Sequence, residues 1–288
     1  MSVRQQRWDY QQAADLRQRL VEQLALLDEH GAEHLHPKEV DARVMQCNGR
    51  RFFAYNAQAV VDHESDLIVA LGLSADENDL AQLVPMMEET KRVLGAVAKM
   101  TDVDTGYASG EQLHQAHQRH LPILVPLQAE SDKGLLPKSS FAYDRERDAY
   151  VCPRGERLTL VGHNKKSRDA SYERAIYRCH TRDCPERAAC SDDPKGRAVS
   201  RTPFDDDLAR QRALMAKPEM RNLYELRKEI VEHIFGCIKG NDGFRRFTVR
   251  GFAKVLAQWA LACTVFNLRK LHQAWTDRNF AWGAPAYA

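Results

Sequence analysis

Residues 41–73 read DARVMQCNGRRFFAYNAQAVVDHESDLIVALGL and contain three apolar runs, at 41–47, 52–61 and 67–73. Residues 62–65, between the last two runs, are polar and of the kind that forms tight turns. We therefore predict three consecutive strands, of which the second and third pair as an antiparallel hairpin.

Helical and strand patterns alternate after this hairpin. Apolar residues recur at helical spacing over 79–94, where Pro85 indicates either a kink or a helix start near Val84. A strand at 97–103, a helix at 110–120 and a strand at 122–127 follow. This alternation predicts an α/β fold with a mixed sheet flanked by helices. Three strands, a crossover helix and a fourth strand form the topology of ribonuclease-H-like folds.

The remaining parts of the chain are helical or irregular. A leucine-bearing helix is predicted at 4–30, and two more at about 219–239 and 251–275. The last of these should close the core with Phe252, Val255, Leu256, Trp259, Cys263 and Phe266. Residues 128–206 are basic, turn-rich and cysteine-bearing, which indicates an insertion before the helix at 219–239. We predict a helical segment at 1–36, a sheet domain split between 37–127 and 207–275, the insertion at 128–206, and a tail at 276–288.

The composition is that of a globular protein of moderate charge. The 288 residues are 43% hydrophobic, and 42 Lys and Arg against 40 Asp and Glu give a net charge of +2. Nucleic-acid binding must therefore come from local charge. No apolar run approaches the ~18 residues of a membrane span, and the polar first residues do not form a signal peptide. With an odd number of cysteines, seven, we expect a cytoplasmic protein in a reducing compartment, without a membrane partner.

Two aspartates are predicted to lie at the same edge of the sheet. Asp41 stands at the first strand and Asp104 follows the fourth. Phosphoryl transfer between nucleic-acid strands uses two divalent ions roughly 3.5–4 Å apart, and magnesium prefers carboxylate oxygens. A glutamate on a helix can complete such a site, so this pattern favours metal-dependent chemistry on phosphates.

Six short segments occur in a characteristic order. They read DARVM at 41–45, YNAQAVVD at 55–62, ND at 78–79, DVDTGY at 102–107, IVEHIFGCIK at 230–239 and GFRRF at 243–247. In this order they resemble the bacterial insertion-sequence transposases with a DDE domain, and the resemblance extends from about Asp41 to Leu271. It implies a ribonuclease-H-like catalytic domain that cleaves DNA and transfers strands, in a nucleoid-associated bacterial protein.

The resemblance assigns three catalytic acids that hold Mg²⁺ or Mn²⁺. They are Asp41, Asp104 and Glu232, matched position by position to the family's segments. Strand alternation puts Asp102 and Asp104 on the same face, so Asp102 remains the alternative second acid. Residues 39–41 read Glu-Val-Asp where an Asp-Pro-Asp sequence is more typical of the family.

The surroundings of the glutamate are predicted to bind DNA. On its helix, two lysines share the face of Glu232 and a tyrosine lies further up, while three arginines cluster in the turn that follows. Cations and an aromatic ring can hold phosphates and a strand end. The predicted DNA contacts are Tyr224, Lys228, Lys239, Arg245, Arg246 and Arg250. Because transposition brings two element ends together, we also expect a homodimer.

Four cysteines gather between residues 152 and 190. Their thiolates could hold a structural zinc tetrahedrally, with His163 or His180 as substitute ligands. The usual spacing of two residues between paired cysteines is missing, so reduced structural thiols are the alternative. The residues concerned are Cys152, Cys179, Cys184 and Cys190.

Other functions fit the same residues. A metal-dependent nuclease on the same fold would cut DNA without joining it, and a zinc-organised interaction module would bind zinc but not DNA. The resembling transposases carry a longer helical DNA-binding region before the first acid, whereas about forty residues precede Asp41. A shortened copy that binds DNA without catalysis is therefore a further alternative, in which 1–36 is the remnant of the DNA-binding region.

Overall fold

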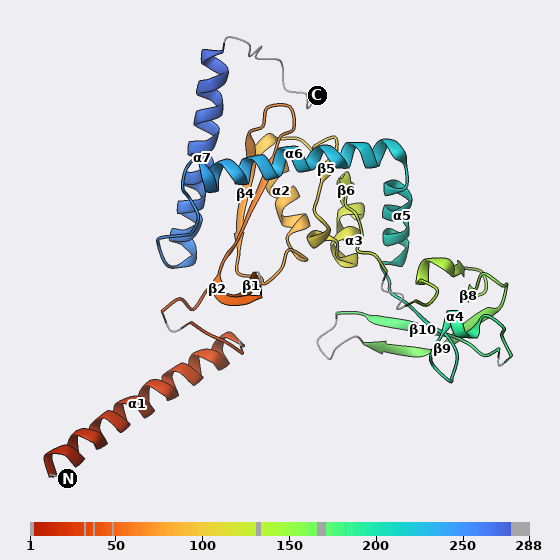
Figure 1. Ribbon diagram of the computed structural model, residues 1–288, viewed down its shortest axis with the longest axis horizontal. Helices are drawn as coiled ribbons and strands as arrows, with labels where there is room; N and C mark the ends of the chain where they lie inside the picture. Colours follow the sequence, from red (N-terminus) through yellow and green to blue (C-terminus); the bar gives the residue numbers. More distant parts are fainter. Residues whose placement is uncertain are drawn as a thin grey trace. The chain divides into compact units, whose positions relative to one another are not determined.

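The computed structural model describes residues 3–31, 33–36, 38–47, 49–130, 134–165, 171–181 and 183–277. The chain divides into two compact units (Figure 1). The first comprises residues 1–99 and 225–288, and the second comprises residues 100–224. The four parts predicted from the sequence stay a prediction.

The first unit contains two antiparallel strand pairs. Strand β1 (Arg43–Cys47) pairs with β2 (Arg50–Ala54), and β3 (Asn56–Val61) pairs with β4 (Ile68–Ser74). The hairpin predicted from the polar turn is confirmed. The single strand predicted at 52–61 is wrong in one respect, because Tyr55 interrupts it and separates β2 from β3.

Helices cover both faces of the β3–β4 hairpin. Gly72 faces α2 (Leu83–Leu94), where an added Cβ would lie 2.6 Å from the sulfur of Met86. Ala57, Ala59 and Leu71 on the other face pack into a cluster with residues of α6 (Pro218–Gly240) and α7 (Phe252–Thr276). Alternation along the strands separates the two faces.

The core of the first unit is built mainly from its two long helices. Its buried members are Ile68, Ile234, Ile238, Trp259, Cys263 and Phe266. The indole N–H of Trp259 donates to the backbone carbonyl of Gln58 at 2.9 Å, which ties α7 to β3. Each large apolar side chain contributes about 1.5–3 kcal/mol when fully buried. The prediction that the last helix closes the core is confirmed by the burial of Val255, Trp259, Cys263 and Phe266.

Helix α1 (Val3–His30) is the helix predicted near the N-terminus. Leu16, Leu20 and Leu24 are at least half exposed on it. Within the part of the chain that the structure describes, neither α1 nor any other helix is long and apolar enough to cross a membrane.

The second unit contains a short parallel pair and helices. Strand β5 (Thr101–Asp102) pairs with β6 (Ile123–Leu124), and α3 (Gly110–Gln118) connects them after a 3-10 turn, η1 (Thr105–Tyr107). Both strands are shorter than predicted. Helix α5 (Asp205–Met215) packs on α3 and β6, and the Gln211 side chain donates to the carbonyls of Ile123 and Val125.

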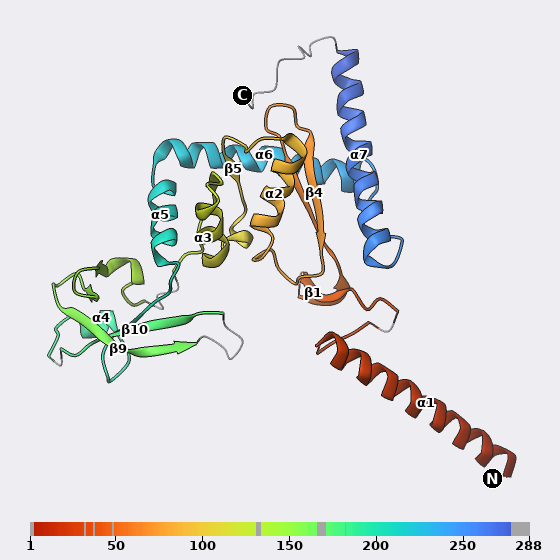
Figure 2. The same cartoon turned by 180° about the vertical axis from the view of Figure 1, so that it is seen from behind.

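An antiparallel sheet of five strands also lies in the second unit (Figure 2). Its order is β11-β10-β9-β8-β7. The strands are β7 (Ala142–Asp144), β8 (Ala149–Val151), β9 (Arg157–Lys165), β10 (Glu173–Cys179) and β11 (Ala198–Arg201). The sheet surrounds a small core of Phe141, Tyr150, Leu158, Tyr177 and Val199, flanked by η2 (Lys138–Ser140) and α4 (Arg187–Cys190).

The chain is thus a mixed α/β protein with helices and a curled antiparallel sheet. Sequence reasoning predicted an irregular insertion over 128–206 and did not predict this sheet. A ribonuclease-H-like arrangement of β1 to β6, and the status of 128–206 as an insertion, stay predictions.

Candidate active site

The loop that carries Asp41 is held by its own backbone. The Glu39 N–H donates to the His36 carbonyl at 3.0 Å, and the Ala42 N–H donates to the Glu39 carbonyl at 3.1 Å. The Arg43 guanidinium donates to the Val40 carbonyl at 2.8 Å, and Ala42 is buried. These bonds fix the backbone on both sides of Asp41.

The Asp41 side chain itself is exposed at the N-terminal end of α7. Its Oδ2 accepts a hydrogen bond from the backbone N–H of Phe252, at the long distance of 3.5 Å. A carboxylate at this end of a helix is favoured by the helix dipole. Asp41 therefore has a defined position and an accessible carboxylate.

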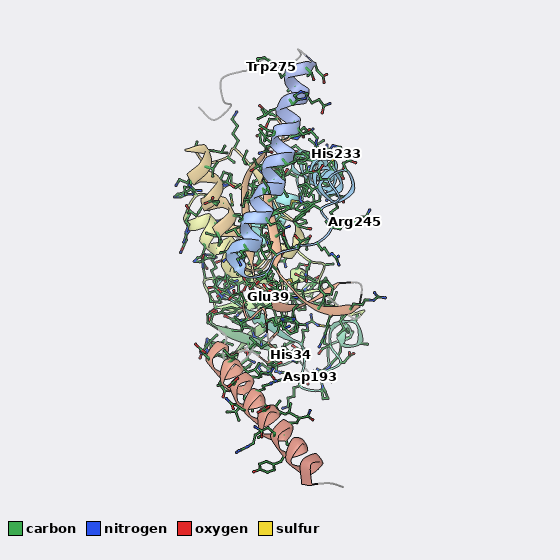
Figure 3. The ribbon with its side chains drawn as sticks, turned by 90° about the vertical axis from the view of Figure 1, so that its left-hand side faces the viewer. His34, Glu39, Asp193, His233, Arg245 and Trp275 are labelled. Atoms are coloured by element: carbon green, nitrogen blue, oxygen red, sulfur yellow. The ribbon has the colours of Figure 1, made fainter. Side chains whose placement is uncertain are left out.

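Glu39 is engaged far more tightly than Asp41. Its Oε1 accepts from the Tyr55 hydroxyl at 2.8 Å and from the backbone N–H of Gly251. Its side chain is only 11% exposed, and Arg250 Nε lies 3.9 Å from its Oε2. Figure 3 shows Glu39 beside the N-terminal end of α7. Sequence reasoning noted this acid only as a departure from the family's pattern and missed its contacts.

Tyr55 connects these two acids to the strands. Burial raises the pKa of the Tyr55 phenol above its usual range, and the hydrogen bond to Glu39 and the negative charges of Glu39 and Asp41 add to the rise. The ring of Tyr55 meets that of Phe252 edge-on, with centroids 5.9 Å apart. Tyr55 therefore stays protonated and donates to Glu39, at the point where β2 ends and β3 begins.

Glu232 lies on α6 with its side chain exposed. Ile234 and Ile238 of the same helix are buried, so the helix turns its apolar face to the core and Glu232 away from it. Lys239 lies on the face of Glu232, and its Nζ is 5.6 Å from the centroid of the Phe235 ring. Tyr224 lies further up the helix as predicted, whereas the side chain of Lys228 is outside the described residues.

The turn between α6 and α7 presents arginines outward. Phe244 and Phe247 pack against the core cluster, with their ring centroids 5.5 Å apart. Arg245 and Arg246 between them are exposed, while Arg250 lies near Glu39. Figure 3 shows His233 of α6 and Arg245 on the same side of α7 in that view. The alternation of phenylalanine and arginine therefore anchors the turn and exposes its cations.

Asp104 follows the parallel strand β5 in the second unit. Val103 is buried and its N–H donates to the Leu124 carbonyl at 2.9 Å, which extends the pairing with β6. The exposed Asp104 caps η1, and its Oδ1 accepts from the Thr105 N–H at 2.7 Å. Asp102 is half-buried within the strand. The carboxyl ends of parallel strands are a common place for sites, and both Asp102, the last residue of β5, and Asp104 lie at this end.

The three predicted acids belong to different units of the chain. Asp41 and Glu232 belong to the first unit and Asp104 to the second, so the convergence of all three stays a prediction. Within the described ranges, no three His, Cys, Asp or Glu side chains already form an arrangement that could hold a metal ion.

The four predicted zinc ligands lie in one neighbourhood of the second unit. Cys152, Cys179 and Cys190 flank the same small core as free thiols. Burial raises the pKa of the Cys190 thiol, Arg197 lowers it, and negative charge on the other three cysteines, Cys184 among them, raises it further. The thiols thus lie near one another, but within the described residues they do not form a metal-binding arrangement. A structural zinc site and reduced structural thiols both remain predictions.

Two partly buried polar networks were not predicted from the sequence. Asp79 accepts from the side-chain amides of Asn56 at 2.6 Å and Gln58 at 2.7 Å, which ties the segment before α2 to β3. Asp207 of α5 is bonded by the Nδ1 atoms of two α3 histidines, each at 2.7 Å. These histidines are His114 and His117. A spacing of three residues on a predicted helix was the only local signal for the second network.

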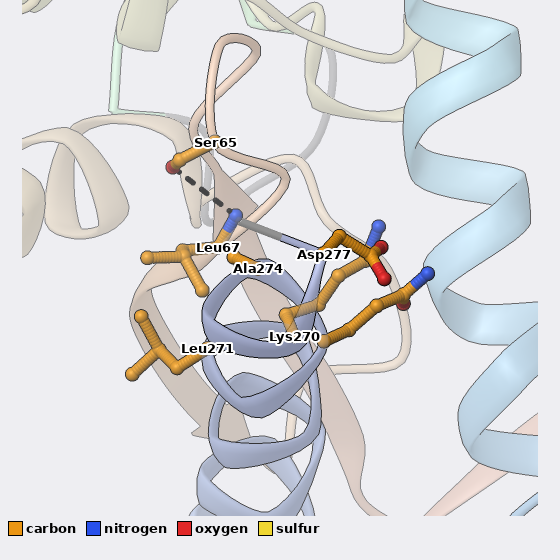
Figure 4. A pocket seen from close by; sticks show the side chains of 7 residues that line it. Ser65, Leu67, Lys270, Leu271, Ala274 and Asp277 are labelled. Atoms are coloured by element: carbon orange, nitrogen blue, oxygen red, sulfur yellow. Dashed lines mark hydrogen bonds between the residues drawn. The ribbon is translucent and has the colours of Figure 1, made fainter. Parts of the chain in front are cut away.

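A hollow in the first unit lies apart from these acids. It is lined by Ser65, Leu67, Lys270, Leu271, Gln273, Ala274 and Asp277, between the β3–β4 turn and the end of α7 (Figure 4). The Leu67 N–H donates to the Ser65 hydroxyl there at 3.3 Å. None of the predicted site residues lines it, so it is not part of the candidate active site.

The comparisons with known proteins give one match. Residues 151–272 match the family model described as transposase DDE domain. No curated protein and no solved structure matches the chain. The matched region includes Glu232, Lys239 and the arginines of the following turn.

Proposed function

Because the match over residues 151–272 supports a DDE-type transposase, we propose that this chain cleaves and transfers DNA strands of an insertion sequence. The observation that carries this proposal is the match itself, which includes Glu232, on the solvent face of α6 with Lys239. Asp41 and Asp104 are proposed as the other two acids. The proposal includes DNA as the partner and a homodimer as the form that brings two element ends together.

The proposed acids suit a divalent ion by their chemistry. All three are exposed carboxylates, and among the described residues Asp41 accepts one hydrogen bond, the long one from the Phe252 N–H. Magnesium and manganese prefer such oxygen ligands. When bound there, the ions would neutralise phosphate charge and activate a water or a 3′-hydroxyl.

The protein's own part in this reaction is positioning and charge. In-line displacement at phosphorus needs an aligned phosphate and compensation of its charge more than a nucleophilic side chain. The proposed phosphate contacts are Tyr224, Lys228, Lys239, Arg245, Arg246 and Arg250. Because phenylalanines anchor the turn that carries Arg245 and Arg246, these cations are presented from a fixed backbone.

We also propose that the four thiols of the second unit take up a structural zinc. Four sulfur donors are sufficient for a tetrahedral zinc ion, and three of these cysteines already flank one core. The zinc would stabilise the five-stranded sheet, and it has no part in the reaction on DNA.

Nicking of a supercoiled plasmid in Mg²⁺ or Mn²⁺ tests the proposed activity. We expect the native protein to nick and Glu232→Gln to lose at least about a hundredfold in rate, since a carboxylate ligand is lost. Glu219→Gln is the matched control, because Glu219 is exposed on α6 but points to another face of the helix.

The outcomes separate the proposed transposase from its alternatives. Nicking without joining of a pre-cut element end to a target indicates a nuclease. DNA binding that persists in EDTA, with no nicking at any ion concentration, indicates a DNA-binding remnant and refutes the proposed activity. Equal loss in Glu219→Gln and Glu232→Gln would remove Glu232 from the site.

A further inference from the structure

Two acids one residue apart, Glu39 and Asp41, have very different surroundings. We propose that Glu39 is a positioning residue: it anchors the loop of Asp41 to Tyr55 and to the start of α7, and so leaves the Asp41 carboxylate free for a divalent ion. This inference rests on the proposed function, because it takes Asp41 as the first acid.

The hydrogen bonds to the Glu39 side chain come from two separate parts of the first unit. Its Oε1 accepts from Tyr55, between β2 and β3, and from Gly251, at the N-cap of α7. Gly251 has φ 86°, a conformation that favours glycine, and this turns its N–H toward Glu39. A single carboxylate oxygen therefore joins the loop, the strands and the helix.

The backbone transmits this anchor to Asp41. The Glu39 carbonyl accepts from Ala42, and the Val40 carbonyl accepts from Arg43, so the peptide units on both sides of Asp41 are bonded. Asp41 then meets the N–H of Phe252, the residue after the one that Glu39 binds. The two carboxylates thus accept hydrogen bonds from consecutive backbone N–H groups, those of Gly251 and Phe252, at the N-terminal end of α7.

The two carboxylates differ in what an ion would have to displace. At Asp41 an ion competes with one hydrogen bond of 3.5 Å. At Glu39 it would displace a tyrosine hydroxyl and a backbone N–H, and approach a side chain that is 89% covered and near Arg250. Asp41 is therefore the acid that would bind the ion, and Glu39 acts by holding the loop that carries Asp41.

The test compares Mn²⁺ binding and Mn²⁺-dependent nicking in four variants of the full chain. They are Glu39→Ala, Glu39→Gln, Asp41→Asn and Ile68→Val. Binding is measured by calorimetry without DNA, so that one readout is independent of activity. Ile68→Val, in the core and away from the loop, shows what a general loss of stability does to both readouts.

Partners that orient metal ligands typically affect metal affinity by about 10–100-fold when removed. For Glu39→Ala we expect Mn²⁺ affinity to fall about tenfold or more, with nicking at saturating Mn²⁺ reduced much less. Glu39→Gln should rescue most of the affinity, because its amide oxygen can still accept from Tyr55 and Gly251. Asp41→Asn should lose nicking even at saturating Mn²⁺.

Three results would overturn the inference. The first is a Glu39→Gln variant that behaves like Asp41→Asn, because that result would make Glu39 a metal ligand itself. Glu39→Ala must lower Mn²⁺ affinity more than Ile68→Val, since equal effects would reduce its role to stability. A native protein that does not bind Mn²⁺ refutes the inference together with the triad, whereas one that binds Mn²⁺ normally but does not nick refutes only the proposed function.

Discussion

Replacement of Asp207 by alanine should destabilise the second unit substantially. Asp207 is 7% exposed and accepts from the Nδ1 atoms of His114 and His117 at 2.7 Å each. Hydrogen bonds to a charged group contribute about 1.5–3 kcal/mol each, and removal of the buried charge offsets part of that sum. We therefore expect the free energy of unfolding to fall by about 2–4 kcal/mol.

This contribution depends on pH with a defined sign. Burial alone would raise the pKa of Asp207, but the hydrogen bonds from His117 and His114 outweigh burial and hold the pKa below its usual value. A carboxylate whose pKa is lowered by folding stabilises the protein above its unfolded pKa, about 3.9. The stabilisation that native protein gains from this charge, and that Asp207→Ala lacks, should vanish as pH falls through the folded pKa of Asp207.

The assay must report on the second unit alone. Because all four tryptophans lie in residues of the first unit, tryptophan fluorescence does not report on the second. Hydrogen exchange of the α3 and α5 amides, measured against urea concentration, does. Asp206→Asn, at the neighbouring position, is the matched control. The Asp206 carboxylate is 44% exposed and pairs with Arg145 and Arg201, so the free energy of unfolding should fall by about 1 kcal/mol or less. Equal effects of the two substitutions would refute the reasoning.

Two further predictions concern DNA and zinc. Joint replacement of Arg245 and Arg246 by alanine should weaken DNA binding, measured by fluorescence anisotropy. The slope of log affinity against log salt should become shallower by about 0.9 per lost phosphate contact. Arg92→Ala, on α2, is the control and should leave this slope unchanged. We expect one zinc per chain by elemental analysis of protein purified without chelator, lost in Cys190→Ser; metal-free protein with all four thiols open to a thiol reagent would contradict the zinc site.

The long helices and the hairpin could be predicted because their signals are local. Apolar spacing gave α1, α2, α3, α6 and α7 within a few residues of their observed ends, and the polar turn at 62–65 gave the pairing of β3 with β4. The break at Tyr55 was not predicted, although the polar residue Asn56 follows Tyr55 directly in this run. At the break, the Tyr55 hydroxyl donates to Glu39.

The five-stranded sheet was missed for a related reason. Strands β7 and β8 have three residues each, too few to show a period of two, and turns separate them. The core that holds them together, formed by Phe141, Tyr150 and Tyr177 among others, depends on contacts between strands. Local pattern therefore does not show β7 and β8, whereas β9 and β10, with nine and seven residues, are long enough to show a period of two.

The candidate site was predictable to the extent that single residues carry its chemistry. Asp41 and Glu232 are exposed, as ligands of an ion need to be, and the aromatic anchoring of Arg245 and Arg246 fits a phosphate contact. The role of Glu39 was not predictable, because its partner Gly251 lies 212 residues further along the chain.

The separation of Glu39 and Gly251 in the sequence has a consequence for folding during synthesis. The first unit is made of two segments, 1–99 and 225–288, and the whole of the second unit is synthesised between them. Glu39 can accept its hydrogen bond from Gly251 only after the ribosome has added Gly251 to the chain. The loop of Asp41 is therefore anchored late, although its residues are synthesised early. A nascent chain that ends before Gly251 therefore carries the loop of Asp41 without this anchor.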